Sequence, residues 1–434
     1  MQKIATPLDG FFALATQHND GQHIGMTSIC SAHPLVIHAT FQEAKTRNAS
    51  VVIEATCNQV NQDGGYTGMT PDTFINFVLK IAKASNFNPA RILFGGDHLG
   101  PNPWRSYPSD VAMEKALVMV FEYAKAGFGK IHLDASMSCQ DDPIPLPENI
   151  IAKRAALLAQ AAEAGARAGG HPAPGYIIGT EVPVPGGATH ALSSVELTRP
   201  QDAAQTIELH RSAFAGLALG DVMARVVGIV VQPGVEFGHS DVIRFDAKAA
   251  QNLSQWRFGE DLVFEAHSTD YQTATALSDL VSGGFAILKV GPGLTFALRE
   301  ALYALDSIAA VLDPDYQTCT LVQSMEKLML SKPENWQSYY SSDATEAAQQ
   351  RHFSYSDRIR YYWGKPAAQA AVNHLMKTLA GRNIPETLIS QFLPSCYNDI
   401  AQKGASALAQ DVIIGHIMTA IAPYSFACES TFQG

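Results

Sequence analysis

The chain is poor in charge and has no excess of positive charge. Asp, Glu, Lys and Arg make up only 16% of its 434 residues, and 30 Lys and Arg against 41 Asp and Glu give a formal net charge of −11. Proteins that bind nucleic acid or an anionic membrane need a basic surface. We therefore expect neither partner. A small phosphorylated ligand remains compatible, because one site needs only local positive charge and free backbone N–H groups.

Several sequence signatures are missing as well. The six cysteines include no C-x-x-C pair, which argues against a zinc ribbon and against a secreted disulfide framework. The N-terminus lacks a signal-peptide pattern, and no apolar run reaches the roughly 18 residues of a membrane span, so we expect a cytoplasmic chain. The P-loop, the nucleophile-elbow and the Rossmann motifs are absent, which speaks against those enzyme classes, kinases of the P-loop type included.

What the sequence does contain is a regular alternation of short apolar runs and longer helical segments. Near-continuous β-branched runs are typical of parallel strands that are covered on both faces. Eight such units in a row predict an α/β fold, namely a (β/α)₈ TIM barrel, and a doubly wound sheet is the alternative. The predicted strands start near Ile24, Val51, Arg91, Lys130, Tyr176, Val226, Leu262 and Phe285.

Helix boundaries and the domain division follow from local signals. Thr70-Pro71 predicts a helix start and Gly127 a helix end, and residues 8–18 are expected to form a helix that closes the bottom of the barrel. The strand pattern stops after residue 312, without a linker rich in Gly, Ser or Pro. We therefore predict a barrel over residues 1–312 and a helical extension over residues 313–434, packed on the barrel mouth.

Ionisable side chains follow nearly every predicted strand, which is where TIM barrels place their active sites. His98, His239 and His267 follow the third, sixth and seventh strands. A single histidine is more often a surface or satisfied core residue, but three imidazoles with an open position suit a catalytic zinc or a similar divalent ion. The sequence thus predicts a metal site on these three loops.

Three carboxylates are the predicted catalytic groups. Asp97 directly precedes His98, so it could act as a general base or simply orient that imidazole, and the sequence leaves both roles open. Glu181 and Asp134 follow neighbouring strands. They are expected either to hold substrate hydroxyls or to pair with Lys289.

Two segments could bind phosphate. Barrels often bind phosphate on the loops after strands seven and eight. In the extension, two arginines could clamp a phosphate over the barrel mouth, although an aromatic surface helix explains that segment equally well. The predicted substrate- and phosphate-binding residues are Ser268, Thr269, Asp270, Lys289, Gly291, Gly293, Arg358 and Arg360.

Long motifs across the chain resemble one known family. SICSAHPLVI, VIEATCNQVNQDGGYTGMTP, GGDHLGPNPW, VVQPGVEFGHS, EAHSTDYQT and SDRIRYYW are similar to the GatZ/KbaZ family, the accessory subunits of class II D-tagatose-1,6-bisphosphate aldolase. The resemblance covers about residues 10 to 400 and implies a barrel related to class II aldolases. Asp97-His98, His239 and His267 match by position the base and the metal ligands of those aldolases.

The resemblance implies a sugar-phosphate substrate but leaves the activity open. Members have been labelled tagatose-6-phosphate kinases, aldolase subunits, and 4-epimerases of D-tagatose 6-phosphate and D-fructose 6-phosphate. Because C4 is not adjacent to the C2 carbonyl, we expect a retro-aldol route in which a divalent metal polarises that carbonyl. We predict a metal-dependent 4-epimerase. The alternative is a non-catalytic partner of a class II aldolase catalytic subunit, and a homo-oligomer is compatible with both.

Overall fold

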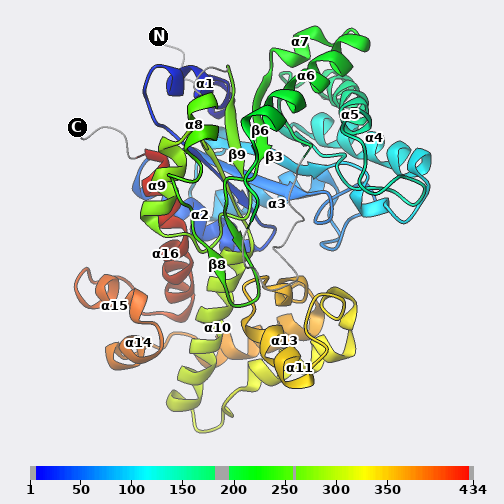
Figure 1. The fold of residues 1–434 in the computed structure, drawn as a ribbon. Helices are drawn as coiled ribbons and strands as arrows, with labels where there is room; N and C mark the ends of the chain where they lie inside the picture. Colours follow the sequence, from blue (N-terminus) through cyan, green and yellow to red (C-terminus); the bar gives the residue numbers. More distant parts are fainter. Residues whose placement is uncertain (1–5, 181–194, 258–260, 430–434) are drawn as a thin grey trace.

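A computed structural model describes residues 6–180, 195–257 and 261–429 of the chain. Its centre is a barrel of parallel strands (Figure 1). The barrel is closed, and its eight strands follow the order β1-β10-β9-β6-β5-β4-β3-β2. Each strand coincides with one of the predicted apolar runs, so the predicted TIM barrel is confirmed. The strands are β1 Met26–Cys30, β2 Val51–Thr56, β3 Ile92–Leu99, β4 Lys130–Leu133, β5 Gly175–Ile178, β6 Val226–Val231, β9 Val263–Ala266 and β10 Ile287–Val290.

Helix α1 (Pro7–Asn19) closes the barrel at the amino ends of the strands, as predicted. Thr6 caps this helix, accepting from the Asp9 N–H while the Asp9 carboxylate accepts from the Thr6 N–H, which satisfies two otherwise unpaired donors. The buried Phe11 and Leu14 form a cluster with strand residues such as Ile177 and Ile287. Because apolar side chains fill this end of the barrel, we expect the polar functional residues at the opposite rim.

The outer helices cover the strands, and their ends follow the predicted signals. The Thr70 hydroxyl caps α3, and Gly127 ends α4 with a φ of 105°, a conformation that favours glycine. A short hairpin of β7 (Glu236–Phe237) and β8 (Val242–Ile243) follows β6 and was not predicted. The helices are α2 Pro34–Thr46, α3 Pro71–Ala84, α4 Ser109–Ala126, α5 Glu148–Gly169, α6 Pro200–Gly216, α7 Gly220–Met223, α8 Gln251–Arg257, α9 Ala274–Ser282 and α10 Pro292–Leu312.

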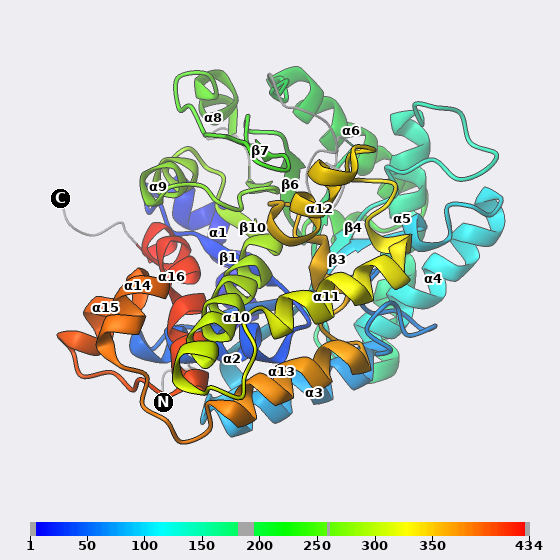
Figure 2. The same cartoon turned by 90° about the horizontal axis from the view of Figure 1, so that it is seen from below.

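The predicted helical extension follows α10. Seen from below, its first helices lie across the barrel end at which the strands terminate (Figure 2). Short 3₁₀ turns lie at Pro89–Arg91, Asn102–Trp104, Pro333–Asn335 and Arg358–Tyr361 (η1 to η4). The helices of the extension are α11 Thr320–Ser331, α12 Ala344–Phe353, α13 Pro366–Thr378, α14 Glu386–Phe392, α15 Pro394–Ala401 and α16 Ala409–Glu429.

Helix α16 departs from the predicted division of the chain. It packs on α2, α9 and α10 at the side of the barrel, and the Gly25 N–H just before β1 donates to the Cys428 carbonyl at 2.9 Å. By length and composition α16 could cross a membrane, contrary to the expectation that no apolar run is long enough, but half of its apolar stretch is buried inside the protein. Packing in the barrel wall accounts for its apolar character.

Candidate active site

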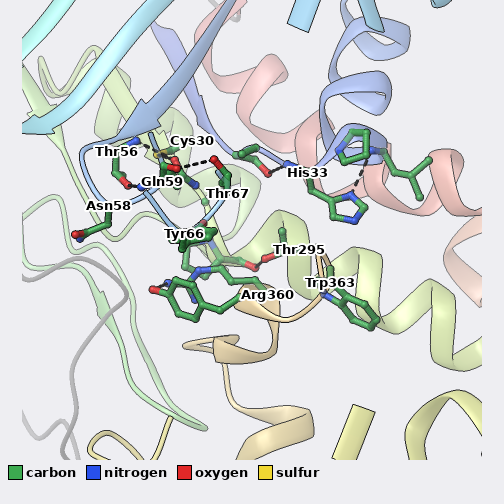
Figure 3. Close-up of a pocket in the computed structure, with 18 of the residues that line it drawn as sticks. Cys30, His33, Thr56, Asn58, Gln59, Tyr66, Thr67, Thr295, Arg360 and Trp363 are labelled. Atoms are coloured by element: carbon green, nitrogen blue, oxygen red, sulfur yellow. Dashed lines mark hydrogen bonds between the residues drawn. The ribbon is translucent and has the colours of Figure 1, made fainter. Parts of the chain in front are cut away.

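A cavity of about 630 Å³ lies between the carboxyl ends of the strands and the extension. Asp97, His98, His267 and Lys289 line it from the barrel. Tyr66, on the loop after β2, lies beside Arg360 of the extension (Figure 3), and its ring meets that of Tyr361 edge-on at 4.8 Å. The extension therefore supplies one wall of the cavity, lined by Arg360, Tyr361, Trp363, Gly364 and Lys365.

A bulge in β3 explains how two consecutive residues reach the cavity. Neighbouring side chains on a regular strand point to opposite faces, yet both Asp97 and His98 line the cavity. The register between β3 and β4 shifts between Gly96 and Leu99, and His98 has a φ of 48°. Such strained, bulged positions re-aim side chains and are frequent at functional sites.

Three buried imidazoles gather at this rim. The ring centroids lie 4.9 Å apart for His98 and His267, 5.1 Å for His98 and His132, and 5.3 Å for His132 and His267. Each ring has one nitrogen on a carboxylate, which is the arrangement that orients metal-bound histidines in proteins. The pairs are His98 Nδ1 with Asp134 Oδ2 at 2.8 Å, His132 Nδ1 with Asp97 Oδ1 at 3.1 Å, and His267 Nε2 with Glu265 Oε1 at 2.8 Å.

A buried network of alternating charges lies beneath and beside the imidazoles. Lys130 Nζ is 2.6 Å from Glu54 Oε1 and 2.6 Å from Glu265 Oε2, and all three side chains are fully buried. Lys289 pairs with the other oxygen of Glu54 and, at 2.8 Å, with Asp97 Oδ2. Because an unpaired buried charge is costly, this chain of partners is what permits so many charges inside the barrel.

The network fixes the protonation of the groups that face the cavity. Burial alone would raise the pKa of Asp97, but His98 and Lys289 hold that pKa well below its usual range. Burial would likewise lower the pKa of Lys289, but Asp97 and Glu54 hold it well above its usual value. Burial lowers the pKa of His267 to about 4, so this imidazole is neutral and can act as a ligand.

Within the part of the chain that the structure describes, two groups of side chains bring potential metal-ligand atoms within 4.8 Å of one another. One consists of Asp97, His132, Glu265 and His267, and the other of Cys30, Glu54 and Asp97. The first offers two imidazoles and two carboxylates, a donor set that suits zinc or a similar divalent ion. Among the described residues, the buried His132 Nε2 meets no hydrogen-bond partner, so the donors at this rim fit a metal ion.

The structure brings two of the three predicted metal ligands together. His98 and His267 are neighbours, whereas the His239 ring packs edge-on against Tyr340 at 5.4 Å and its Nδ1 lies 2.9 Å from Ser354 Oγ. The predicted trio therefore does not form one ligand group. The reason is the hairpin that the sequence did not reveal: His239 lies in the turn between β7 and β8, in contact with the extension.

Among the predicted catalytic carboxylates, Asp134 is engaged locally. Its Oδ2 pairs with His98, and its Oδ1 accepts from the Ser136 N–H at 3.0 Å and the Ser136 hydroxyl at 2.6 Å. It does not pair with Lys289, which contacts Glu54 and Asp97 instead. Glu181 lies outside the described residues.

The predicted phosphate ligands separate into two sets. Ser268, Asp270, Lys289, Gly291 and Arg360 line the cavity. Three others do not. The Thr269 hydroxyl donates to the Lys289 carbonyl, the Gly293 N–H donates to Asp270 at 2.7 Å, and the Arg358 guanidinium lies over the Tyr339 ring at 3.3 Å. Arg358 packs on aromatic rings of the extension, as the alternative explanation of this segment expects, whereas Arg360 lines the cavity.

Four buried residues of this rim were not singled out from the sequence. Glu54, Lys130, His132 and Glu265 each lie within a short apolar strand. A single ionisable residue inside a buried strand is a usable signal, since burial without a partner is costly. Only the closed barrel shows that these four positions meet.

Comparison with known proteins identifies the family. A curated Agrobacterium fabrum protein named D-tagatose 6-phosphate 4-epimerase is 55% identical over 88% of this chain and 90% of its own length. The Klebsiella pneumoniae D-tagatose-1,6-bisphosphate aldolase subunit GatZ is 47% identical over 96% of this chain and 99% of its own length. A solved structure from Sinorhizobium meliloti, described as a probable tagatose 6 phosphate kinase, superposes with a TM-score of 0.87 at 52% identity, covering 93% of this chain and 100% of that one. The family model described as D-tagatose-1,6-bisphosphate aldolase subunit GatZ/KbaZ-like matches residues 11–429, and the chain belongs to this family.

Proposed function

We propose that this protein is a metal-dependent 4-epimerase that interconverts D-tagatose 6-phosphate and D-fructose 6-phosphate in the cytoplasm. The observation that carries the proposal is the cavity itself, in which two carboxylate-oriented imidazoles, an anionic Asp97 and a cationic Lys289 face a space of sugar-phosphate size. The relative named as such an epimerase shares 55% of its aligned residues with this chain. A subunit that only supports another protein has no need of such a cavity.

A retro-aldol route accounts for inversion at C4 without any oxidation or reduction. The C4 hydroxyl loses its proton, the C3–C4 bond breaks, and its electron pair passes to the dihydroxyacetone fragment as an enediolate. The C4 aldehyde of the other fragment turns its opposite face, the C3–C4 bond forms again, and the proton returns to the C4 oxygen. A bound divalent metal supplies Lewis acidity toward the C2 carbonyl.

The residues of the rim have distinct roles in this proposal. His132 and His267 would hold the metal, because both belong to the group whose potential ligand atoms lie within 4.8 Å of one another. His98, the other predicted ligand, lies beside them, with its ring centroid 4.9 Å from that of His267. Lys289 places a fixed positive charge beside the reacting carbons, which favours the developing negative charge. The strongly lowered pKa of Asp97 favours its orienting role over that of a general base, since such a carboxylate accepts a proton poorly. We therefore assign the C4 hydroxyl proton to Glu181, a carboxylate that the sequence predicts as catalytic.

The alternative function is that of a non-catalytic aldolase subunit, and the Klebsiella relative is named as a subunit. One assay distinguishes the two functions. The purified chain, loaded with zinc or manganese, is incubated with fructose 6-phosphate, and we expect tagatose 6-phosphate to form. No product with either metal, together with a class II aldolase that gains activity or stability when this chain is added, would favour the subunit.

Arg360 is the expected ligand of the 6-phosphate. Its side chain lines the cavity, held by the Asp357 carbonyl at 3.1 Å and by the Tyr361 hydroxyl at 3.0 Å. A hydrogen bond to a charged group contributes about 1.5–3 kcal/mol, so Arg360→Gln should raise KM roughly 10- to 100-fold. Initial-rate kinetics with fructose 6-phosphate test this.

Arg358→Gln is the matched comparison for the phosphate assignment. Its guanidinium packs on Tyr339 and donates to the Asn335 carbonyl, so we expect lower thermal stability with an unchanged KM. An equal rise of KM in both variants would instead show that both arginines bind the phosphate.

A further inference from the structure

The usual phosphate position of a TIM barrel is filled here by a side chain of the protein itself. That position lies between the loops after strands seven and eight, at the start of a helix. In this chain Asp270 follows β9, and Gly291 to Gly293 begin α10. The Asp270 Oδ1 accepts from the Gly291 N–H at 3.0 Å and from the Gly293 N–H at 2.7 Å.

We propose that Asp270 is a specificity-determining residue that excludes a phosphate group from this end of the cavity. The site would then select a ketohexose with a free hydroxyl at C1 and reject the 1,6-bisphosphate. This inference rests on the proposed function, which places a ketohexose phosphate in the same cavity.

Geometry supports the exclusion. The two N–H groups that a phosphate would use already have an acceptor, and Asp270 is only 3% exposed. A Cβ built on Gly293 would lie 3.0 Å from Asp270 Oδ1, so the carboxylate fills the cradle in front of the helix. A phosphate would have to displace this carboxylate into a buried space where a free charge is costly.

The negative charge of Asp270 also supports the exclusion of a phosphate group. Burial raises the pKa of Asp270 to about 6, so the carboxylate still carries its negative charge at pH 7.5. An approaching phosphate dianion is repelled, whereas a sugar hydroxyl can donate a hydrogen bond to the same group. The cavity also holds Arg360 and Lys365 on its extension wall, so one phosphate has a cationic partner and a second one would meet an anion.

Binding measurements at pH 7.5 test the proposal without requiring turnover. Calorimetry with metal-loaded protein compares fructose 6-phosphate with fructose 1,6-bisphosphate. We expect the wild-type chain to bind the monophosphate at least tenfold more tightly. In Asp270→Asn, which keeps the size and an acceptor oxygen but removes the charge, this preference should fall at least tenfold. The exposed Asp399→Asn, far from the cavity and paired with Lys403, should keep the wild-type preference.

Each outcome of these measurements either supports or overturns the proposed role of Asp270. A wild-type chain that binds both compounds equally, or an Asp270→Asn chain with an unchanged preference, overturns the proposal, and the wild-type comparison alone suffices if the variant does not fold. Failure to bind either compound overturns it as well, together with the proposed function. A binding preference of the expected size without epimerisation would contradict the proposed function and leave the role of Asp270 standing.

Discussion

Replacing His267 with Gln is expected to remove the bound metal and to lower kcat/KM for epimerisation about a thousandfold. His267 is the one residue common to the ligand set predicted from the sequence and the ligand group found in the structure. Its Nε2 is held by Glu265 at 2.8 Å, which leaves Nδ1 for a metal. Loss of Lewis-acid stabilisation amounts to several kcal/mol, and roughly 4 kcal/mol corresponds to a factor of about 10³. Metal content after dialysis and initial rates provide the two measurements.

His239→Gln is the matched comparison. Its ring contacts Ser354 and Tyr340 rather than the other imidazoles, so this variant should retain metal near the wild-type level. A His239→Gln chain that loses its metal while His267→Gln keeps it would contradict the ligand assignment.

The second large effect is expected from Lys130, a fully buried residue that does not line the cavity. Lys130→Met shortens the side chain by only one atom but removes the ammonium group that separates the Glu54 and Glu265 carboxylates. Removing one partner of a buried ion pair typically costs about 3–5 kcal/mol, because the remaining charge stays buried and uncompensated. We expect a loss of this size in the free energy of unfolding, measured by urea denaturation.

An exposed ion pair provides the control. Lys403 is paired with Asp399 at 2.7 Å and its side chain is 74% exposed, so Lys403→Met should change the free energy of unfolding by less than about 1 kcal/mol. Equal effects at Lys130 and Lys403 would show that the buried network does not stabilise the barrel.

The barrel was predictable because its signal is local and repeated. Each strand is a short apolar run, as at Val51 or Val226, and some helices begin or end at a recognisable cap, such as Thr70 for α3 and Gly127 for α4. The rim was predictable only in part. His98 lies near the carboxyl end of β3 and His267 directly follows β9, so their convergence follows from the fold. His239 is displaced by a hairpin whose two strands, of two residues each, are too short to show a periodic pattern.

The sequence could not show which groups of the site would pair with one another. Asp270, Gly291 and Gly293 were all expected to serve a phosphate, yet they bind one another. Arg358 and Arg360 are two residues apart, but within η4 one packs on aromatic rings and the other lines the cavity. Such outcomes depend on which groups from distant segments become neighbours, and that is set by tertiary packing.

The most direct test of the account uses fructose 6-phosphate that carries deuterium at C4. A retro-aldol route never breaks the bond between C4 and its hydrogen, so the metal-loaded protein should produce tagatose 6-phosphate that retains the deuterium at C4, as read by mass spectrometry and NMR. Tagatose 6-phosphate in which the deuterium has exchanged with solvent, or no tagatose 6-phosphate at all, would contradict epimerisation by carbon–carbon cleavage at this site.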